Sequence, residues 1–406
     1  MAEVHPVIIV GGGPAGMVAG LLFARAGVRV TILEKHADFL RDFRGDTVHP
    51  STLELFSEIG LLDELLKEPH AAIDTMTLNL MGEQFTIATM KHLPVAARFV
   101  AMMPQWDLLD FIAGQGKRYP TFDLRMSTEA TGLIYDDAGR VSGVTLASGD
   151  VLPARLVIAA DGRRSVLRDA AALPLEDLGA PMDVLWFRIP VPAGMDMSEV
   201  ALGTIDKGGM VVAIPRGDYW QCAQIIGKGG FSAIEARGIA AFRERVVEIA
   251  PGLAAGIGAI QSFDDVKLLS VALDRLTRWS RPGLLAIGDA AHAMSPVGGV
   301  GINLAVQDAV ATANILAAPL AAGADPDPLL DLVQERRWKS TVRMQGLQRF
   351  AHRNVIEPML RGEITRVPFA VRLLDRIPLL RRIPGRILGL GFGRQHVQSP
   401  LAKEFS

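Results

Sequence analysis

The strand, turn and helix pattern near the start of the chain constrains the fold more than any other feature of the sequence. Residues 7–10 read Val-Ile-Ile-Val, which is typical of a buried parallel strand. The next residues, 11–16, read Gly-Gly-Gly-Pro-Ala-Gly and fit G-x-G-x-x-G, and a second apolar run ends at Glu34. Such glycines allow a tight turn, close approach to a pyrophosphate and close helix packing, while the acid binds a ribose hydroxyl. The sequence therefore predicts that an ADP-containing ligand contacts Gly11, Gly13, Pro14, Ala15, Gly16, Glu34 and Lys35.

The same arrangement, an apolar strand that ends beside an acid and a glycine, occurs twice more. Residues 156–160 lead into Asp161 and Gly162, and residues 284–287 lead into Gly288 and Asp289. A carboxylate at such a place can accept hydrogen bonds from ligand hydroxyl groups, and we expect the next helix to begin at Asp289. One extended ligand, touched at the three strand ends, would account for all three acids.

A glycine-rich turn follows at residues 296–303 and leads into an apolar helical pattern at 302–316. Its glycines suit a backbone that lies flat against a ligand, and a helix N-terminus there would face developing negative charge. An ordinary strand, turn and helix would produce the same pattern, so this stretch alone leaves both interpretations open.

Composition narrows the class of protein and its partners. Hydrophobic residues make up 49% of the 406 residues, charged residues make up 21%, and the formal net charge is -2, so no strong field draws the chain to nucleic acid or to an anionic membrane. The single cysteine, Cys222, excludes an internal disulfide and a cysteine-cluster metal site, and we expect no metal. This usage predicts a cytoplasmic protein. The uncharged run at 7–24 carries glycines and a proline in its middle, which disfavours a membrane span.

The order of patterns predicts an α/β fold with a Rossmann-like parallel sheet. We assign residues 1–72, 101–180 and 276–345 to the cofactor-binding part. Residues 73–100 and 181–275 alternate with period two and predict an inserted, mostly antiparallel substrate-binding sheet, with a pocket at the boundary between the two parts. Residues 336–406 look helical and basic, and we expect 346–406 to form a covering helical layer rather than a membrane anchor.

In this order, the motifs resemble those of the single-component FAD-dependent aromatic hydroxylases of the p-hydroxybenzoate hydroxylase type, over nearly the whole chain. The resemblance implies that Glu34 and the first glycine turn bind the ADP half of FAD. It implies that Asp161 and Gly162 belong to a motif that the family uses for both FAD binding and nicotinamide binding. A third implication is that Asp289 binds the ribityl chain. It also implies that the isoalloxazine is lined by Pro296, Gly298, Gly299, Val300, Gly301, Ile302 and Asn303, with Arg44 and Gln105 as further FAD contacts.

The resemblance further implies a reaction. NADH or NADPH reduces FAD, dioxygen adds to the reduced flavin, and the resulting flavin hydroperoxide hydroxylates an aromatic or polyketide-like small molecule. The partners would be that substrate and dioxygen, without nucleic acid and without a membrane, and a homodimer is an assembly that the sequence permits. A second strand-linked G-x-G-x-x-G is lacking, which agrees with transient nicotinamide binding.

Other functions and the catalytic residues stay open at this point. A flavin-dependent halogenase would need a Trp-x-Trp-x-Ile-Pro stretch that the sequence lacks, whereas an FAD-dependent reductase or dehydrogenase, or a non-catalytic flavin-binding redox protein, would carry the same motifs. No catalytic base can be assigned. The candidates are Tyr219, which a packed strand would also explain, His49, which we expect at the surface, and His92. A solvated side chain would explain Arg44 equally well.

Overall fold

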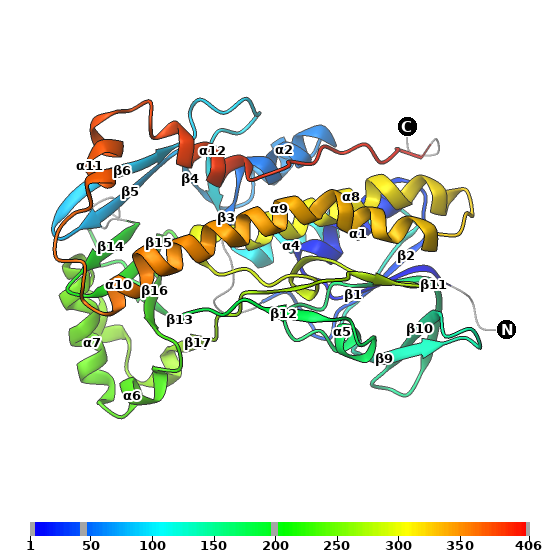
Figure 1. Ribbon diagram of the computed structural model, residues 1–406, viewed down its shortest axis with the longest axis horizontal. Coiled ribbons are helices and arrows are strands. Elements are labelled where there is room, and N and C mark those ends of the chain that lie inside the picture. Colours follow the sequence, from blue (N-terminus) through cyan, green and yellow to red (C-terminus); the bar gives the residue numbers. More distant parts are fainter. Residues whose placement is uncertain (1–4, 41–46, 196–201, 403–406) are drawn as a thin grey trace.

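The computed structural model describes residues 5–40, 47–195 and 202–402, and two main β-sheets lie next to each other along its long axis (Figure 1). The larger sheet has a parallel core, and the apolar runs of the sequence form its buried strands. In spatial order its core strands are β20 (Leu284–Ala286), β11 (Val151–Ala159), β1 (His5–Val10), β2 (Val30–Leu33) and β8 (Phe122–Arg125). Antiparallel strands β19 (Ser280–Arg281), β10 (Val141–Leu146) and β9 (Ala130–Tyr135) complete it.

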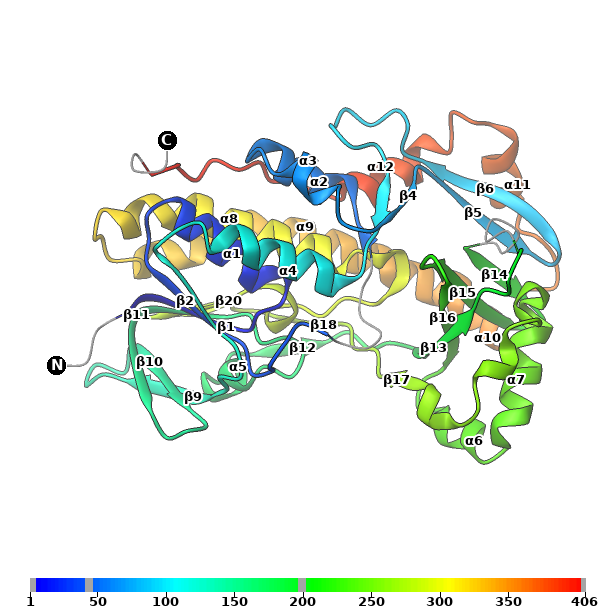
Figure 2. The ribbon, with the colours of Figure 1, turned by 180° about the vertical axis from the view of Figure 1, so that it is seen from behind.

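Four helices form a layer on one face of this sheet, as both ribbon views show (Figure 2). They are α1 (Pro14–Arg25), α4 (Gln105–Gly116), α8 (Gly301–Ala321) and α9 (Leu330–Ala351). Helix α8 lies in the middle of this layer, and most of its side chains are buried. The region 297–321 is long and apolar enough to cross a membrane, yet 72% of its most apolar window is buried inside the fold, as expected of a core helix. The boundary that we expect at residue 345 falls inside α9.

The second sheet has seven strands and is mostly antiparallel, as the period-two pattern predicts. Its order is β17 (Lys267–Leu269), β13 (Met182–Pro190), β16 (Tyr219–Gly227), β15 (Gly209–Pro215), β14 (Gly203–Asp206), β5 (Thr75–Leu80) and β6 (Glu83–Thr89). On one face Leu185 and Phe187 pack against α7 (Gly238–Ile249), near the short α6 (Phe231–Glu235). Because side chains alternate along a strand, Trp186 faces the other side.

Smaller elements connect the two sheets. A three-stranded sheet contains β3 (Thr47–Val48), β7 (Val100–Met102) and β4 (Ala71–Ile73), and a pair contains β12 (Leu175–Asp177) and β18 (Asp274–Leu276). The short helices are α2 (Pro50–Glu58), α3 (Leu62–Leu65), α5 (Val166–Ala170), α10 (Glu357–Leu360), α11 (Phe369–Arg376) and α12 (Arg382–Leu390).

Two sequence-based expectations about helices are wrong. No α-helix begins at Asp289, because residues 288–290 form a 3₁₀ turn and the helix begins only at Gly301. The C-terminal region is not helical to its end. Gly391 has a φ of 67°, which a helix cannot continue, and residues 391–402 form no helix and run to the end of α1, where the Ala402 N–H donates to the Arg25 carbonyl.

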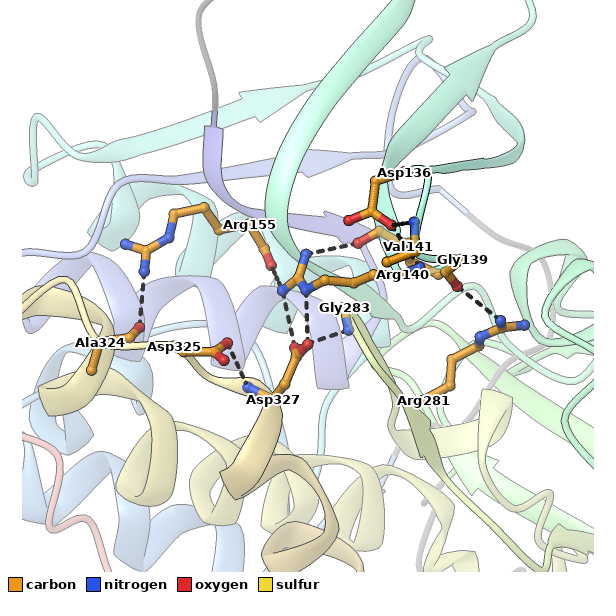
Figure 3. A network of polar contacts seen from close by, with 11 residues as sticks. Asp136, Gly139, Arg140, Val141, Arg155, Arg281, Gly283, Ala324, Asp325 and Asp327 are labelled. Atoms are coloured by element: carbon orange, nitrogen blue, oxygen red, sulfur yellow. Dashed lines mark hydrogen bonds and ion pairs between the residues drawn. The ribbon is translucent and has the colours of Figure 1, made fainter.

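A polar network closes the edge of the larger sheet at which β20 begins (Figure 3). The Arg140 guanidinium donates to both carboxylate oxygens of Asp327, at 2.7 and 2.9 Å, and the Gly283 N–H donates to the same carboxylate at 2.9 Å. Arg155 donates to the Ala324 carbonyl nearby. These contacts fasten the β9–β10–β11 region to the connection between α8 and α9.

Candidate functional site

The ends of four neighbouring parallel strands bring the acids and glycine turns of the sequence to one edge of the larger sheet. The strand order is β20, β11, β1 and β2, and the last residues of these strands are in register: Val10 pairs with Ala159 and Leu33, and Ala159 pairs with Ala286. The residues that follow are Gly288 and Asp289, Asp161, Gly11, and Glu34. Ligands of open α/β sheets bind at such a carboxyl edge.

In the first turn, the packing leaves no room for a side chain at Gly11 or Gly16, whereas the space beside Gly13 is open. At Gly11, whose φ is 110°, an added Cβ would lie 2.3 Å from the Ala160 carbonyl oxygen, and at Gly16 it would lie 2.0 Å from the Gly11 oxygen. At Gly13 an added Cβ would meet no atom within 4 Å. Gly13 is also the N-cap of α1, which no side chain of the described residues caps. An open face before an uncapped helix N-terminus fits a pyrophosphate.

Glu34 is fixed directly above this turn. Its side chain is buried, and its carboxylate accepts the Gly12 N–H at 2.9 Å and the His36 N–H at 3.0 Å. The His36 ring Nδ1 lies 2.5 Å from the same carboxylate. Lys35, in contrast, is exposed to solvent. The structure thus holds the predicted ribose-binding acid at the end of β2, next to the glycine turn.

The Asp161 side chain forms hydrogen bonds within the turn that follows β11. Its carboxylate accepts the Ser165 hydroxyl at 2.5 Å and the Leu167 N–H at 3.3 Å, in front of α5. Burial raises the pKa of Asp161, and the hydrogen bond from Ser165 opposes that rise. Contact of Asp161 and Gly162 with FAD stays a prediction.

Asp289 is half-buried and forms an ion pair that the sequence analysis missed. Its carboxylate accepts the Arg163 Nε–H at 3.1 Å, and the two side chains are 32% and 31% exposed. Arg163 belongs to the turn after β11, so the pair joins two neighbouring strand ends. The signal in the sequence was the arginine two residues after Asp161. A charged pair that is open to solvent at the ligand edge is accessible to the hydroxyl groups of a ligand.

The loop at residues 296–303 is held from behind by residues 47–52. The Thr47 hydroxyl donates to the Gly299 carbonyl at 2.8 Å, while the His49 N–H and the Thr52 hydroxyl donate to Asn303 Oδ1 at 3.2 and 2.6 Å. Gly299 has a φ of 64°, and an added Cβ there would lie 2.5 Å from the Thr47 hydroxyl. No described side chain caps the N-terminus of α8 at Gly301, so its first N–H groups suit negative charge on a ligand. The two threonines carried no motif signal.

The other candidate residues lie at separate places. His49 is 2% exposed, so the expected surface position is wrong: the ring Nδ1 lies 2.7 Å from the Leu388 carbonyl oxygen, and burial lowers its pKa. His92 lies beside α12, where burial and then the charges of Arg382 and Arg386 lower its pKa. Tyr219 begins β16 and lies under the Arg188 guanidinium, 5.2 Å from ring centroid to Cζ. Gln105 is the first residue of α4. Arg44 lies outside the described residues.

Comparison with known proteins shows the family. The family model described as an FAD binding domain matches residues 4–345. A 6-methylpretetramide 4-monooxygenase from Streptomyces rimosus is 32% identical to this chain, and the alignment covers 98% of this chain and 95% of that protein. The chain belongs to the FAD-dependent aromatic hydroxylase family.

Solved structures of the family share the fold. PqsL, a probable FAD-dependent monooxygenase from Pseudomonas aeruginosa, superposes with a TM-score of 0.75 at 21% identity, over 90% of this chain and 100% of that chain. OxyS anhydrotetracycline hydroxylase from Streptomyces rimosus has a TM-score of 0.74 at 21% identity, over 95% of this chain and 76% of that chain. The α/β fold, the FAD cofactor and the monooxygenase class that the sequence predicts are confirmed by membership of this family.

Three features of these residues fit FAD. The open face at Gly13 and the uncapped α1 provide room and N–H groups for the pyrophosphate. Glu34 and Asp289 stand at two strand ends on either side of it. The N-terminus of α8 at Gly301 also lacks a side-chain cap from the described residues, which leaves its first N–H groups available to a ligand. Among the described residues, no group of three His, Cys, Asp or Glu side chains is arranged to hold a metal ion.

Proposed function

We propose that this protein uses FAD, NADH or NADPH, and dioxygen to hydroxylate a fused polycyclic aromatic polyketide. The substrate class is supported by the Streptomyces rimosus relative, which is named for its action on 6-methylpretetramide and aligns over nearly the full length of both chains. The observation that carries the site is the meeting of four parallel strand ends at Gly11, Glu34, Asp161 and Asp289.

In this proposal three of the turns at the carboxyl edge each contact one part of FAD. Glu34 accepts the ribose hydroxyls of the ADP half, the open face at Gly13 holds the pyrophosphate, and Asp289 accepts the ribityl hydroxyls. The N–H groups at the start of α8 stabilise negative charge at the flavin ring, which lies against residues 298–303. When bound, FAD supplies hydride acceptance from the nicotinamide and activation of dioxygen. Further contacts are proposed for Lys35, Arg44, Gln105 and Gly162.

The substrate is proposed to bind between the loop at 296–303 and the seven-stranded sheet. Val297 packs in the same cluster as Trp186 and Val212, which share one face of that sheet because both pair with Ala223. Around these side chains the face is apolar, and Arg188 and Gln221 lie farther along it. It belongs to the part formed by 73–100 and 181–275, whereas the parallel sheet and its helices form the FAD-binding part. A broad apolar wall next to the loop fits a flat, fused-ring substrate.

The test is oxygen transfer measured with isotopically labelled dioxygen. FAD-loaded protein is given NADH or NADPH and a hydroxylated tetracyclic aromatic compound, and both nicotinamide oxidation and product mass are followed. We expect the substrate to stimulate nicotinamide oxidation and the product to gain one labelled oxygen atom, whereas labelled water under unlabelled dioxygen should leave the product unlabelled. Nicotinamide oxidation without oxygen transfer would indicate a reductase, and bound FAD without turnover would indicate a non-catalytic flavoprotein.

A further inference from the structure

A buried charged cluster lies directly behind the turn that carries Asp289. Asp308, in the middle of α8, is fully buried, and its carboxylate accepts the Arg337 Nε–H at 2.7 Å from α9. It also accepts the ring Nε2–H of His292 at 2.6 Å and the backbone N–H of Gly288 at 3.1 Å. Three charge-assisted hydrogen bonds thus converge on one carboxylate among the apolar side chains of α8.

The carboxylate is charged in the folded protein, which decides how the partners are arranged. Burial alone would raise the pKa of Asp308, but the charges and hydrogen bonds of His292 and Arg337 outweigh burial and lower it. A carboxylate only accepts hydrogen bonds, so the His292 Nε2 that lies 2.6 Å from it carries a proton.

The two contacts of Asp308 with the turn lie on either side of Asp289. Gly288 precedes Asp289, and His292 follows it by three residues; the N–H of His292 also donates to the Gly288 carbonyl at 2.9 Å. Both ends of the turn are therefore held from inside the protein, while the Asp289 carboxylate lies at the half-exposed ligand edge. Arg337 extends the support further, since its Nη1–H donates to the Gly393 carbonyl at 3.2 Å in the C-terminal segment.

We propose that Asp308 is a positioning residue which, with His292 and Arg337, fixes the turn at 288–292 so that the Asp289 carboxylate faces FAD. The inference rests on the proposed role of Asp289 as the ribityl acceptor. Burial of the Asp308 and Arg337 charges costs desolvation free energy, and such an ion pair adds little stability over well-packed apolar side chains. The inference gives these buried charges a role in cofactor binding. A carboxylate that acts through Asp289 should lose its effect on FAD binding when Asp289 is absent.

A double-mutant cycle on the FAD dissociation constant tests this coupling. Wild type, Asp289→Asn, Asp308→Asn and the double variant are compared by titration of apoprotein with FAD. We expect each single substitution to weaken FAD binding by about tenfold or more, and the double variant to bind FAD within about twofold of Asp289→Asn, because the two residues act in series. Independent effects that multiply in the double variant, or an unchanged affinity of Asp308→Asn, would overturn the inference.

Two controls separate positioning from general stability. Asp183 is a second buried carboxylate with three donors, Lys228 Nζ at 2.8 Å, Gly229 N–H at 2.8 Å and Val271 N–H at 2.9 Å, but it lies in the seven-stranded sheet. Asp183→Asn should lower the melting temperature and leave FAD affinity within about twofold of wild type. His292→Gln keeps an N–H donor toward Asp308 and should retain more FAD affinity than His292→Leu. Equal FAD affinity of these two His292 variants would also contradict the proposal.

The cycle distinguishes failure of the inference from failure of the proposed site. If Asp289→Asn binds FAD as tightly as wild type does, the proposed role of Asp289 is wrong. If Asp289→Asn weakens binding and the effect of Asp308→Asn simply multiplies with it, only the positioning role of Asp308 is wrong. Should Asp308→Asn fail to fold, Arg337→Gln takes its place in the same cycle.

Discussion

At the scale of single residues, Glu34 offers the sharpest test of the ADP half of the site. Its carboxylate accepts two backbone N–H groups, so Glu34→Gln places an amide NH₂ against a donor in a buried position. We expect FAD binding to weaken by roughly 1–3 kcal/mol, measured by titration of apoprotein, because a buried hydrogen-bonding group loses its partner. Asp183→Asn, in the seven-stranded sheet, is the control and should leave FAD affinity within about twofold of wild type. Unchanged affinity in Glu34→Gln would mean that the acid only supports the turn.

The sequence reveals residues of this kind when a local pattern carries them. Glu34 and Asp289 stand at the ends of apolar strands beside glycines, and both could be placed from spacing alone. Arg163 and Asp308 could not be assigned, because their partners come from other strands and helices. His49 was misplaced for the same reason: its burial comes from the Leu388 carbonyl region, 339 positions away in the chain.

At the scale of elements, Asp183 ties three segments of the seven-stranded sheet together, and its contribution depends on pH. Burial alone would raise its pKa, but Lys228 and the N–H groups of Gly229 and Val271 outweigh burial and lower it. A folded-state pKa below the unfolded value of about 3.9 contributes stability that is present above that value and lost as the pH falls through the folded pKa.

Asp183→Asn should therefore destabilise the protein by roughly 1–3 kcal/mol at neutral pH, and this difference from wild type should shrink below about pH 4. Denaturant unfolding at a series of pH values measures it. A difference that stays constant down to the lowest pH at which the protein folds would show that the charge of Asp183 is not involved.

The polar network of Arg140, Asp327 and Gly283 clamps the edge of the parallel sheet opposite the ligand edge. A substitution in this clamp should lower the stability of the protein without changing its affinity for FAD. Asp327→Asn removes the charge from a bidentate pair with Arg140 whose side chains are 19% and 25% exposed. We expect a loss of roughly 1–3 kcal/mol in the free energy of unfolding, which is less than for a fully buried pair because of this exposure. FAD affinity should remain unchanged, since the clamp lies away from the ligand edge; a clear loss of affinity would contradict the assignment of the two edges.

Strands could be predicted from the sequence where a single pattern, such as an apolar run or a period-two alternation, extends over the whole strand. The β-branched runs gave the parallel strands, and the period-two alternation gave β13, β15 and β16. The C-terminal helices stop at Leu390, whereas the sequence predicted a helical layer over residues 346–406. Local propensity does not reveal such ends, because the turn at Gly391 and the contacts of the following segment with α1 decide where the chain leaves the helix.

At the scale of the whole molecule, the site is formed by segments that are far apart in the chain. The order of motifs predicted a parallel FAD-binding sheet and a second sheet, and both are present. The sequence could not show that α9 runs along both sheets, as Figure 1 illustrates, or that residues 47–52 support the loop at 296–303 from behind. Those arrangements depend on packing between segments about 250 residues apart.

An experimental structure of the protein with FAD bound tests the central claim most directly. We predict that the adenosine ribose lies against Glu34, the pyrophosphate in front of Gly13 and α1, the ribityl chain at Asp289, and the isoalloxazine against residues 298–303. Electron density for FAD at any other place, or a ring that lies away from that loop while the strand ends contact no part of the cofactor, would contradict the account.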